Sequence, residues 1–146
     1  FWNDSIKLEV IGYSRYHIDT TIANLGPAPW RLTCIYGEAQ VAEHYKTWET
    51  LCSIAGSSNL PWMALGDFNE VLIQAEHEGV NPRAQGQMDS FREALDIFGF
   101  ADLGYKGRMW TFEKRVAGGT YTRVRLDRAV ATHPGVVYFR MRRWRI

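Results

Sequence analysis

An apolar run at residues 60–65, Leu-Pro-Trp-Met-Ala-Leu, ends abruptly in Gly66-Asp67-Phe68-Asn69. If this segment is extended, residues 67 and 69 share one side and Phe68 points the other way, back into apolar packing. A carboxylate can orient a water molecule or bind a hard cation, and a carboxamide can donate a hydrogen bond to a developing negative oxygen. The spacing therefore predicts that Asp67 and Asn69 face a phosphate. The alternative is a plain turn, because Asp and Asn are favoured where a strand ends and the backbone bends.

Strands dominate the elements that would position these residues. The run at 60–65 is wholly apolar and short, which predicts a strand buried on both faces. Five other segments alternate apolar and polar residues or are rich in β-branched residues, and they predict further strands: 6–14, 17–25, 30–37, 109–115 and 121–130. The last two would be joined by a Gly118-Gly119 turn, and residues 139–146 would begin a final strand.

Two segments have the helical period instead. Apolar residues recur every three or four positions between residues 41 and 55, with Gly56 at the helix stop. A second helix is predicted around residues 88–98 and is closed by Gly99, with Ser90 and Glu93 forming a capping box if the helix starts late. His133-Pro134 opens a short helical turn. Strands with helices between them predict an α/β (α+β) sandwich in which helices lie outside packed sheets.

The composition is that of one folded domain spanning residues 1–146. Hydrophobic residues make up 46% and aromatic residues 14% of the chain, which excludes a disordered protein. No signal peptide is recognisable and no stretch approaches the roughly 20 apolar residues of a membrane helix. The chain lacks a starting Met and begins within an element pattern, so we expect a fragment. Two cysteines, Cys34 and Cys52, lie in strand-like and helix-like runs and are predicted to be buried thiols of a reduced, intracellular protein.

The net charge of +1 hides an asymmetry along the chain. Residues 1–105 carry 6 Lys/Arg against 14 Asp/Glu, a balance of −8, whereas residues 106–146 carry 11 against 2, a balance of +9. Two readings stay open. Either the opposite charges pair across the fold or lie solvated, or the basic segment forms a face for a polyanion.

Several motifs in the same order resemble the endonuclease/exonuclease/phosphatase superfamily, which has the DNase I-like fold. They are YSRYHIDTTI, WRLTCIYGEA, TWETL, LPWMALGDFNEVL, FREALDIFGFADLGYKG and RLDRAVA. The likeness is closest to the endonuclease domain of plant LINE-type (non-LTR) retroelements and covers roughly residues 6–140. It implies a four-layer α-β-β-α sandwich with mixed, largely antiparallel sheets, incomplete at both ends.

The resemblance also implies roles for individual residues. Asp67 would orient the attacking water or contact the metal, and Asn69 would bind the scissile phosphate. Tyr36, in CIYG, would reach a phosphate oxygen; alternatively it is a core or rim aromatic. Asp127, in RLDR, would hold a catalytic histidine in its productive tautomer; alternatively it forms a salt bridge with Arg125 or Arg128.

Parts of the family's machinery have no counterpart in these residues. Neither the metal-binding glutamate of an early strand nor the closing Ser-Asp-His motif is found, and for His17, His44, His77 and His133 we expect structural or solvent roles. The cofactor implied by the resemblance is Mg²⁺ (or Mn²⁺), which would find here only an incomplete site.

Basic and aromatic residues of the second half are candidate nucleic-acid contacts. Trp110 and Phe112 could line a groove beside Arg108 and Lys114, which suits base stacking and phosphate contact. Arg125 is a further candidate in the basic segment. The same spacing fits plain core packing on a strand.

The leading hypothesis is a remnant of a Mg²⁺-dependent phosphodiesterase that nicks DNA, inactive as this span alone, and nuclear if it is a retroelement product. Alternatives are a phosphatase of the same superfamily acting on inositol phosphates or phospholipids, and a non-catalytic or pseudogene-derived domain. DNA is the expected partner. We expect no membrane association, and no protein partner is evident from the sequence.

Overall fold

The computed structural model describes residues 6–115, 119 and 121–140. Its strands are β1 (Lys7–Tyr13), β2 (His17–Ala23), β3 (Trp30–Tyr36), β4 (Trp62–Asp67), β5 (His77–Glu78), β6 (Phe100–Asp102), β7 (Phe112–Arg115), β8 (Tyr121–Val124) and β9 (Asp127–Thr132). Its helices are α1 (Tyr45–Ala55), α2 (Gln85–Ile97) and α3 (His133–Arg140), with short 3-10 turns at Val41–Glu43 and Gln74–Glu76. No helix of the described part is long and apolar enough to cross a membrane.

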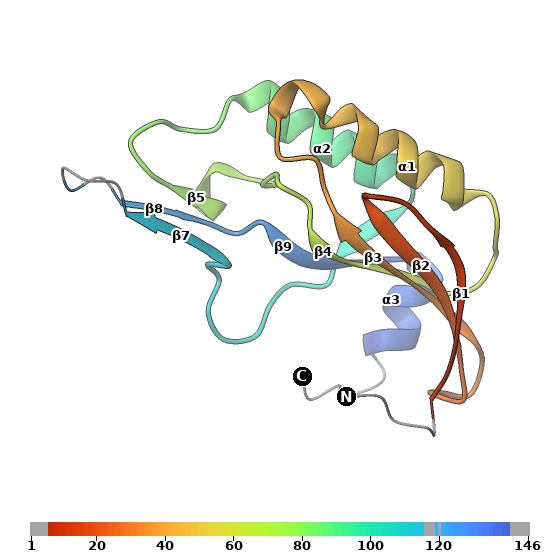
Figure 1. The fold of residues 1–146 in the computed structure, drawn as a ribbon. Coiled ribbons are helices and arrows are strands. Elements are labelled where there is room, and N and C mark those ends of the chain that lie inside the picture. The colour runs from red at the N-terminus through yellow and green to blue at the C-terminus, as the bar shows by residue number, and fades with distance from the viewer. Residues whose placement is uncertain (1–5, 116–118, 120, 141–146) are drawn as a thin grey trace.

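The strands form two sheets, as Figure 1 shows. The larger has six strands in the order β1-β2-β3-β4-β9-β6, and the smaller has three in the order β5-β8-β7. Among the strands of the described residues, only β3 and β4 pair in parallel, because α1 carries the chain from the end of one to the start of the other. The predicted α+β class with largely antiparallel sheets is confirmed, and the parallel pair brings the carboxyl ends of β3 and β4 to one edge.

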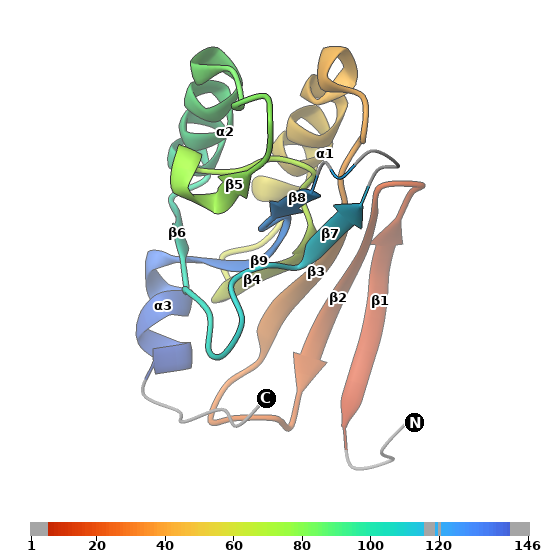
Figure 2. The same ribbon diagram turned by 90° about the vertical axis from the view of Figure 1, so that its left-hand side faces the viewer.

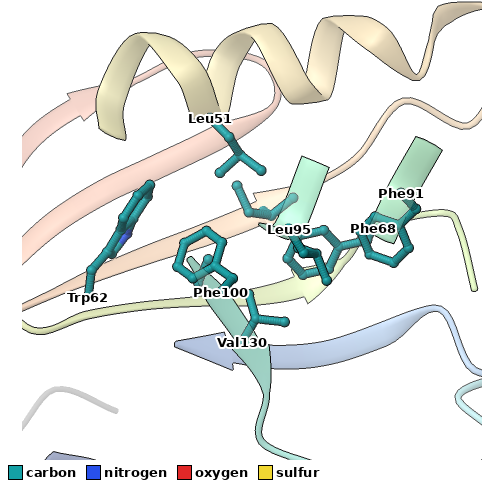
Figure 3. Packing of buried hydrophobic residues seen from close by; sticks show 9 residues of the cluster. Leu51, Trp62, Phe68, Phe91, Leu95, Phe100 and Val130 are labelled. Carbon is teal, nitrogen blue, oxygen red and sulfur yellow. The ribbon is translucent and has the colours of Figure 1, made fainter. Parts of the chain in front are cut away.

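The main core lies between the large sheet and α1 and α2, which run side by side over one of its faces (Figures 1 and 2). Figure 3 shows its members, which come from both helices, from β3, β4, β9 and β6, and from the turn after β4: Ile35, Leu51, Trp62, Ala64, Phe68, Phe91, Leu95, Phe100 and Val130. The helical period predicted both helices correctly. Because α2 begins at Gln85, however, Ser90 lies inside it and donates to the Gly86 carbonyl, so the predicted capping box is wrong.

A buried ion pair crosses this layer. Arg31 on β3 is 1% exposed, and its Nε and Nη2 donate to the two oxygens of Asp19 at 2.9 and 2.6 Å. Thr33 donates to the same carboxylate, and the remaining Arg31 nitrogen Nη1 donates to the Ile54 carbonyl near the end of α1. The network therefore ties β2, β3 and α1 together through satisfied polar groups.

The opposite face of the large sheet is covered only in part. At one end α3 packs there around Ile22, Trp30, Ala131 and Phe139. Towards the other end the described residues leave an apolar row across three strands, which we call the bare row: Ile18, Cys34 and Leu65, paired in register. The prediction that residues 60–65 are buried on both faces is therefore wrong.

Both cysteines are exposed, contrary to the prediction. Cys34 alternates with the buried Ile35 along β3, and Cys52 follows the buried Leu51 on α1, so each thiol points away from the main core. Residues 121–130 are also not one strand: Arg125 and Leu126 separate β8 in the small sheet from β9 in the large one. The predicted last strand fails at residues 139–140, which belong to α3, and its remainder lies outside the described residues, as does the Gly118 half of the predicted glycine turn.

Candidate phosphate-binding site

Strand register brings three of the predicted site residues side by side. Tyr36 on β3 is the Cα partner of Asp67 on β4, and Asp67 is the partner of Asp127 on β9. All three lie on the sheet face away from α1 and α2, at the edge where β3 and β4 end. Tyr36 is 64% exposed, Asp127 is exposed and Asp67 is half-buried. Side chains separated by 91 residues of sequence thus share one solvent-open rim.

Two glycines allow neighbouring backbone segments to approach each other closely at this rim. A Cβ on Gly66, whose φ is +140°, would lie 2.0 Å from the Ile35 carbonyl oxygen on the neighbouring strand. A Cβ on Gly37 would lie 2.8 Å from the Phe68 carbonyl oxygen. Because neither side chain is present, the Gly37 N–H can donate to the Asp67 carbonyl at 2.6 Å. The end of β3 is therefore fastened to the residues that follow β4.

Asn69 is held in a tight turn rather than in an extended strand. Its φ is +55°, a left-handed conformation that Asn tolerates better than most residues. Its backbone N–H donates to Asp67 Oδ1 at 2.7 Å, and its side-chain Nδ2 donates to the Gly37 carbonyl at 2.7 Å. The turn chemistry weighed for this motif is thus present. A carboxamide nitrogen carries two hydrogens, however, so one donor remains after the bond to Gly37.

The surroundings of Asp67 disfavour its charge. Burial raises the pKa of this carboxyl above its usual value, and the nearby Asp127 raises it further, while the Asn69 N–H acts in the opposite direction. A carboxyl with a raised pKa keeps more basic character than a free one. Phe68, by contrast, is 1% exposed and packs in the main core, as predicted.

Backbone hydrogen bonds hold Asp127 in place at the start of β9. The Thr111 hydroxyl accepts hydrogen bonds from the N–H groups of Leu126 and Asp127, both at 2.9 Å. The Leu126 carbonyl accepts from the Phe68 N–H at 3.1 Å, which joins the start of β9 to the turn after β4. The sequence analysis missed Thr111 because it placed this residue inside a predicted strand over 109–115, whereas β7 begins only at Phe112.

The arginines flanking Asp127 are occupied elsewhere. Arg125 donates to Glu76 and Asp102 at 2.6 and 3.0 Å, and Arg128 donates to the same two carboxylates, both at 2.8 Å. In the described residues neither arginine pairs with Asp127, so its carboxylate is left exposed at the rim. These pairs also favour the reading in which the opposite charges of the two chain segments meet across the fold.

The candidate nucleic-acid residues differ in exposure. Arg125 is 5% exposed and committed to its ion pairs, so its position argues against contact with DNA. Arg108 and Lys114 are exposed, the latter on β7 of the small sheet. Trp110 is half-buried, with the Arg123 guanidinium 4.9 Å from its ring centroid. Since β8 leads directly into β9, the small sheet adjoins the same edge as the rim.

In the described ranges, no three His, Cys, Asp or Glu side chains are placed to hold a metal ion together. At the rim, Asp67 and Asp127 are two neighbouring carboxylates. Among the histidines, His44 is 7% exposed and lies beside Glu70 at the start of α1. His77 is on β5, and burial lowers the pKa of both imidazoles.

No family model matches the chain, and no curated protein matches it either. Among solved structures it is similar to the endonuclease domain of TRAS1, a telomere-specific non-LTR retrotransposon: the TM-score is 0.64 and the identity 17%, over 91% of this chain and 58% of that one. It is also similar to the 3′ phosphatase NExo from Neisseria bound to product DNA hairpin, with a TM-score of 0.60 and 13% identity over 92% of this chain and 60% of that one. The chain thus spans 58–60% of the length of these neighbours. At such low identity the matches show the fold, which is the DNase I-like α+β fold.

Proposed function

We propose that the rim formed by Tyr36, Asp67, Asn69 and Asp127 binds a phosphate group of DNA in a domain of the metal-dependent nuclease type. The observation that carries the proposal is the register of β3, β4 and β9, which aligns the phenol and the two carboxylates beside the Asn69 turn. The named neighbours, a retrotransposon endonuclease domain and a 3′ phosphatase bound to product DNA hairpin, support DNA as the class of substrate.

Each side chain has a distinct task in this proposal. The Tyr36 hydroxyl and the second Asn69 amide hydrogen donate to phosphate oxygens, while Asp67, with its raised pKa, accepts a proton from a water molecule. Mg²⁺ is commonly held by one or two carboxylates together with substrate phosphates; in that alternative Asp67, beside Asp127, would hold the ion instead of accepting a proton from water. When bound, the ion would neutralise charge that develops on the phosphate.

These residues supply only part of a nuclease site. The glutamate and the Ser-Asp-His motif of the resembled superfamily have no counterpart among the 146 residues. We therefore propose that the span alone binds DNA but turns it over slowly or not at all, as expected for a retroelement endonuclease remnant acting in the nucleus.

The test measures DNA binding by fluorescence anisotropy at fixed salt, with and without Mg²⁺, and follows nicking of supercoiled plasmid in parallel. Because a hydrogen bond to a charged group contributes about 1.5–3 kcal/mol, Asn69→Ala should weaken binding roughly 10- to 150-fold. Tyr36→Phe should act in the same direction, while Glu49→Gln, a charge removal on the exposed side of α1, should not weaken it. Equal affinity of Asn69→Ala, Tyr36→Phe and the unaltered chain would refute the proposed site. Mg²⁺-dependent nicking by the span would refute its inactivity while supporting the nuclease assignment.

A second candidate is binding of a terminal phosphate, which the similarity to a 3′ phosphatase favours. A DNA hairpin with a 3′ phosphate and the same hairpin with a 3′ hydroxyl separate the two candidates. Preference for the phosphorylated end that disappears in Asn69→Ala would support this function. Equal affinity for both hairpins would favour contact with internal phosphates.

A further inference from the structure

A fully buried carboxylate follows the phosphate-site turn directly. Glu70 is 0% exposed, and its Oε1 accepts a hydrogen bond from the Val71 N–H at 2.9 Å. Burying a carboxylate is costly unless charged groups face it, so its partners define its task. Nothing in the proposed chemistry uses Glu70, since its side chain points into the fold rather than to the rim.

Two cationic or ionisable groups face this carboxylate. Arg83, from the loop before α2, places its Nε 3.5 Å from Glu70 Oε1. His44, at the start of α1, places its Nδ1 3.6 Å from Glu70 Oε2. Glu70 thus lies between two segments that the sequence separates widely, and it draws the Arg83 side chain towards the turn.

The far end of Arg83 reaches the site itself. Its Nη2 donates to the Asn69 carbonyl at 3.4 Å, a long bond whose position depends on where the guanidinium is held. The Arg83 backbone N–H donates to the Gln74 side-chain oxygen at 3.1 Å, which fixes the loop that carries the arginine. One guanidinium therefore connects the buried carboxylate to the residue whose amide faces the rim.

We infer that Glu70 and Arg83 are positioning residues for Asn69: the Glu70 carboxylate anchors Arg83, and Arg83 holds the Asn69 carbonyl so that the turn keeps its left-handed conformation and its amide stays aimed at the phosphate. The expected effect on DNA binding rests on the proposed function, but the contacts among Glu70, Arg83 and Asn69 do not. The Asn69 N–H and Nδ2 bonds tie the turn to the ends of β4 and β3, and Arg83 ties it to the loop before α2.

A purely structural role would give a different pattern of effects. If Glu70 only stabilised the fold, replacing it would lower the unfolding midpoint without altering the Asn69 turn or DNA affinity in molecules that remain folded. If it positions Asn69, the environment of the Asn69 amides must change even in the folded state. Because the two residues act in series, removing both should do no more than removing one.

The experiment compares Glu70→Gln, Arg83→Lys, the combined variant and Asn69→Ala in the same chain, with Glu49→Gln as the charge-matched control. Nuclear magnetic resonance follows the Asn69 backbone and side-chain amide signals, and anisotropy follows DNA affinity. We expect Glu70→Gln and Arg83→Lys to shift both Asn69 signals and to weaken binding about 3- to 10-fold, with the combined variant no weaker than either. Glu49→Gln should leave these signals in place.

The outcomes distinguish a positioning role of Glu70 and Arg83 from a purely structural one. Unmoved Asn69 signals in folded Glu70→Gln and Arg83→Lys, or multiplied losses in the combined variant, would overturn the positioning role. Arg83 is partly exposed, so Arg83→Lys decides the question alone if Glu70→Gln does not fold. If Asn69→Ala leaves affinity unchanged, the proposed function fails, whereas shifts of the Asn69 signals still report whether the two residues hold the turn.

Discussion

Gly66→Ala tests the packing of the strand end on which the site is built. The new methyl group would lie 2.0 Å from the Ile35 carbonyl oxygen, and the residue would have to keep a φ of +140°. Such a conformation costs a non-glycine residue about 1–3 kcal/mol. To relieve the overlap, β3 and β4 must also separate, which weakens one or two ladder hydrogen bonds at about 0.5–1.5 kcal/mol each.

The expected loss is therefore about 2–6 kcal/mol, a large part of the roughly 5–15 kcal/mol typical of a domain. Urea unfolding followed by tryptophan fluorescence measures it, since Trp62 is buried in the main core. Gly12→Ala is the matched control, because a Cβ there meets no atom within 4 Å, and it should change stability by less than about 0.5 kcal/mol. A Gly66→Ala protein as stable as the Gly12→Ala protein would refute the close approach of β3 and β4.

Two further substitutions probe charge. The folded state raises the pKa of Asp67, so it binds a proton there more tightly than the unfolded chain does, and stability falls as pH rises from the ordinary aspartate pKa through the raised folded one. In thermal unfolding at pH 7, Asp67→Asn should therefore be more stable than the unaltered chain. This difference in stability should vanish near pH 3, below the ordinary aspartate pKa of about 3.9. An Asp67→Asn protein that is less stable at pH 7 would contradict the predicted direction of the effect. Asp19→Asn leaves the buried Arg31 without its carboxylate and should cost about 3–5 kcal/mol, read as a lower urea midpoint at unchanged slope. A loss below about 1 kcal/mol would mean that water reaches this arginine.

Local patterns located the parts of the site that lie at strand ends. The apolar run before Gly66 is a property of a single strand, and it predicted Asp67 at a strand end before any pairing was known. Tyr36 and Asp127 were named only because CIYG and RLDR resemble motifs of the superfamily, and the strand register now shows them beside Asp67. The position of Asn69 was predicted from strand alternation, which does not apply to this residue. The chain leaves the strand after Asp67, so a left-handed turn and not strand alternation aims its side chain.

Contacts between distant segments were beyond the reach of these patterns. Arg125 reads as a candidate DNA contact in the sequence, but its partner Glu76 lies 49 residues away in a polar loop, and nothing in the sequence links the two. The same holds for Glu70 and Arg83, whose meeting depends on how the loop before α2 returns to the end of β4. A wholly apolar strand such as 60–65 also cannot reveal that one of its faces lacks a cover.

The bare row has a practical consequence for experiments on any longer protein that contains this domain. Cys34 lies two residues before Tyr36 on the same side of β3, and Leu65 stands in the same relation to Asp67 on β4. Anything that packs on the row thus sits roughly 7 Å, two strand residues, behind the rim and borders the proposed phosphate site. Reaction of Cys34 with a thiol reagent reads out whether that surface is occupied, and Cys52, exposed on the far helix layer, calibrates the rate within the same molecule.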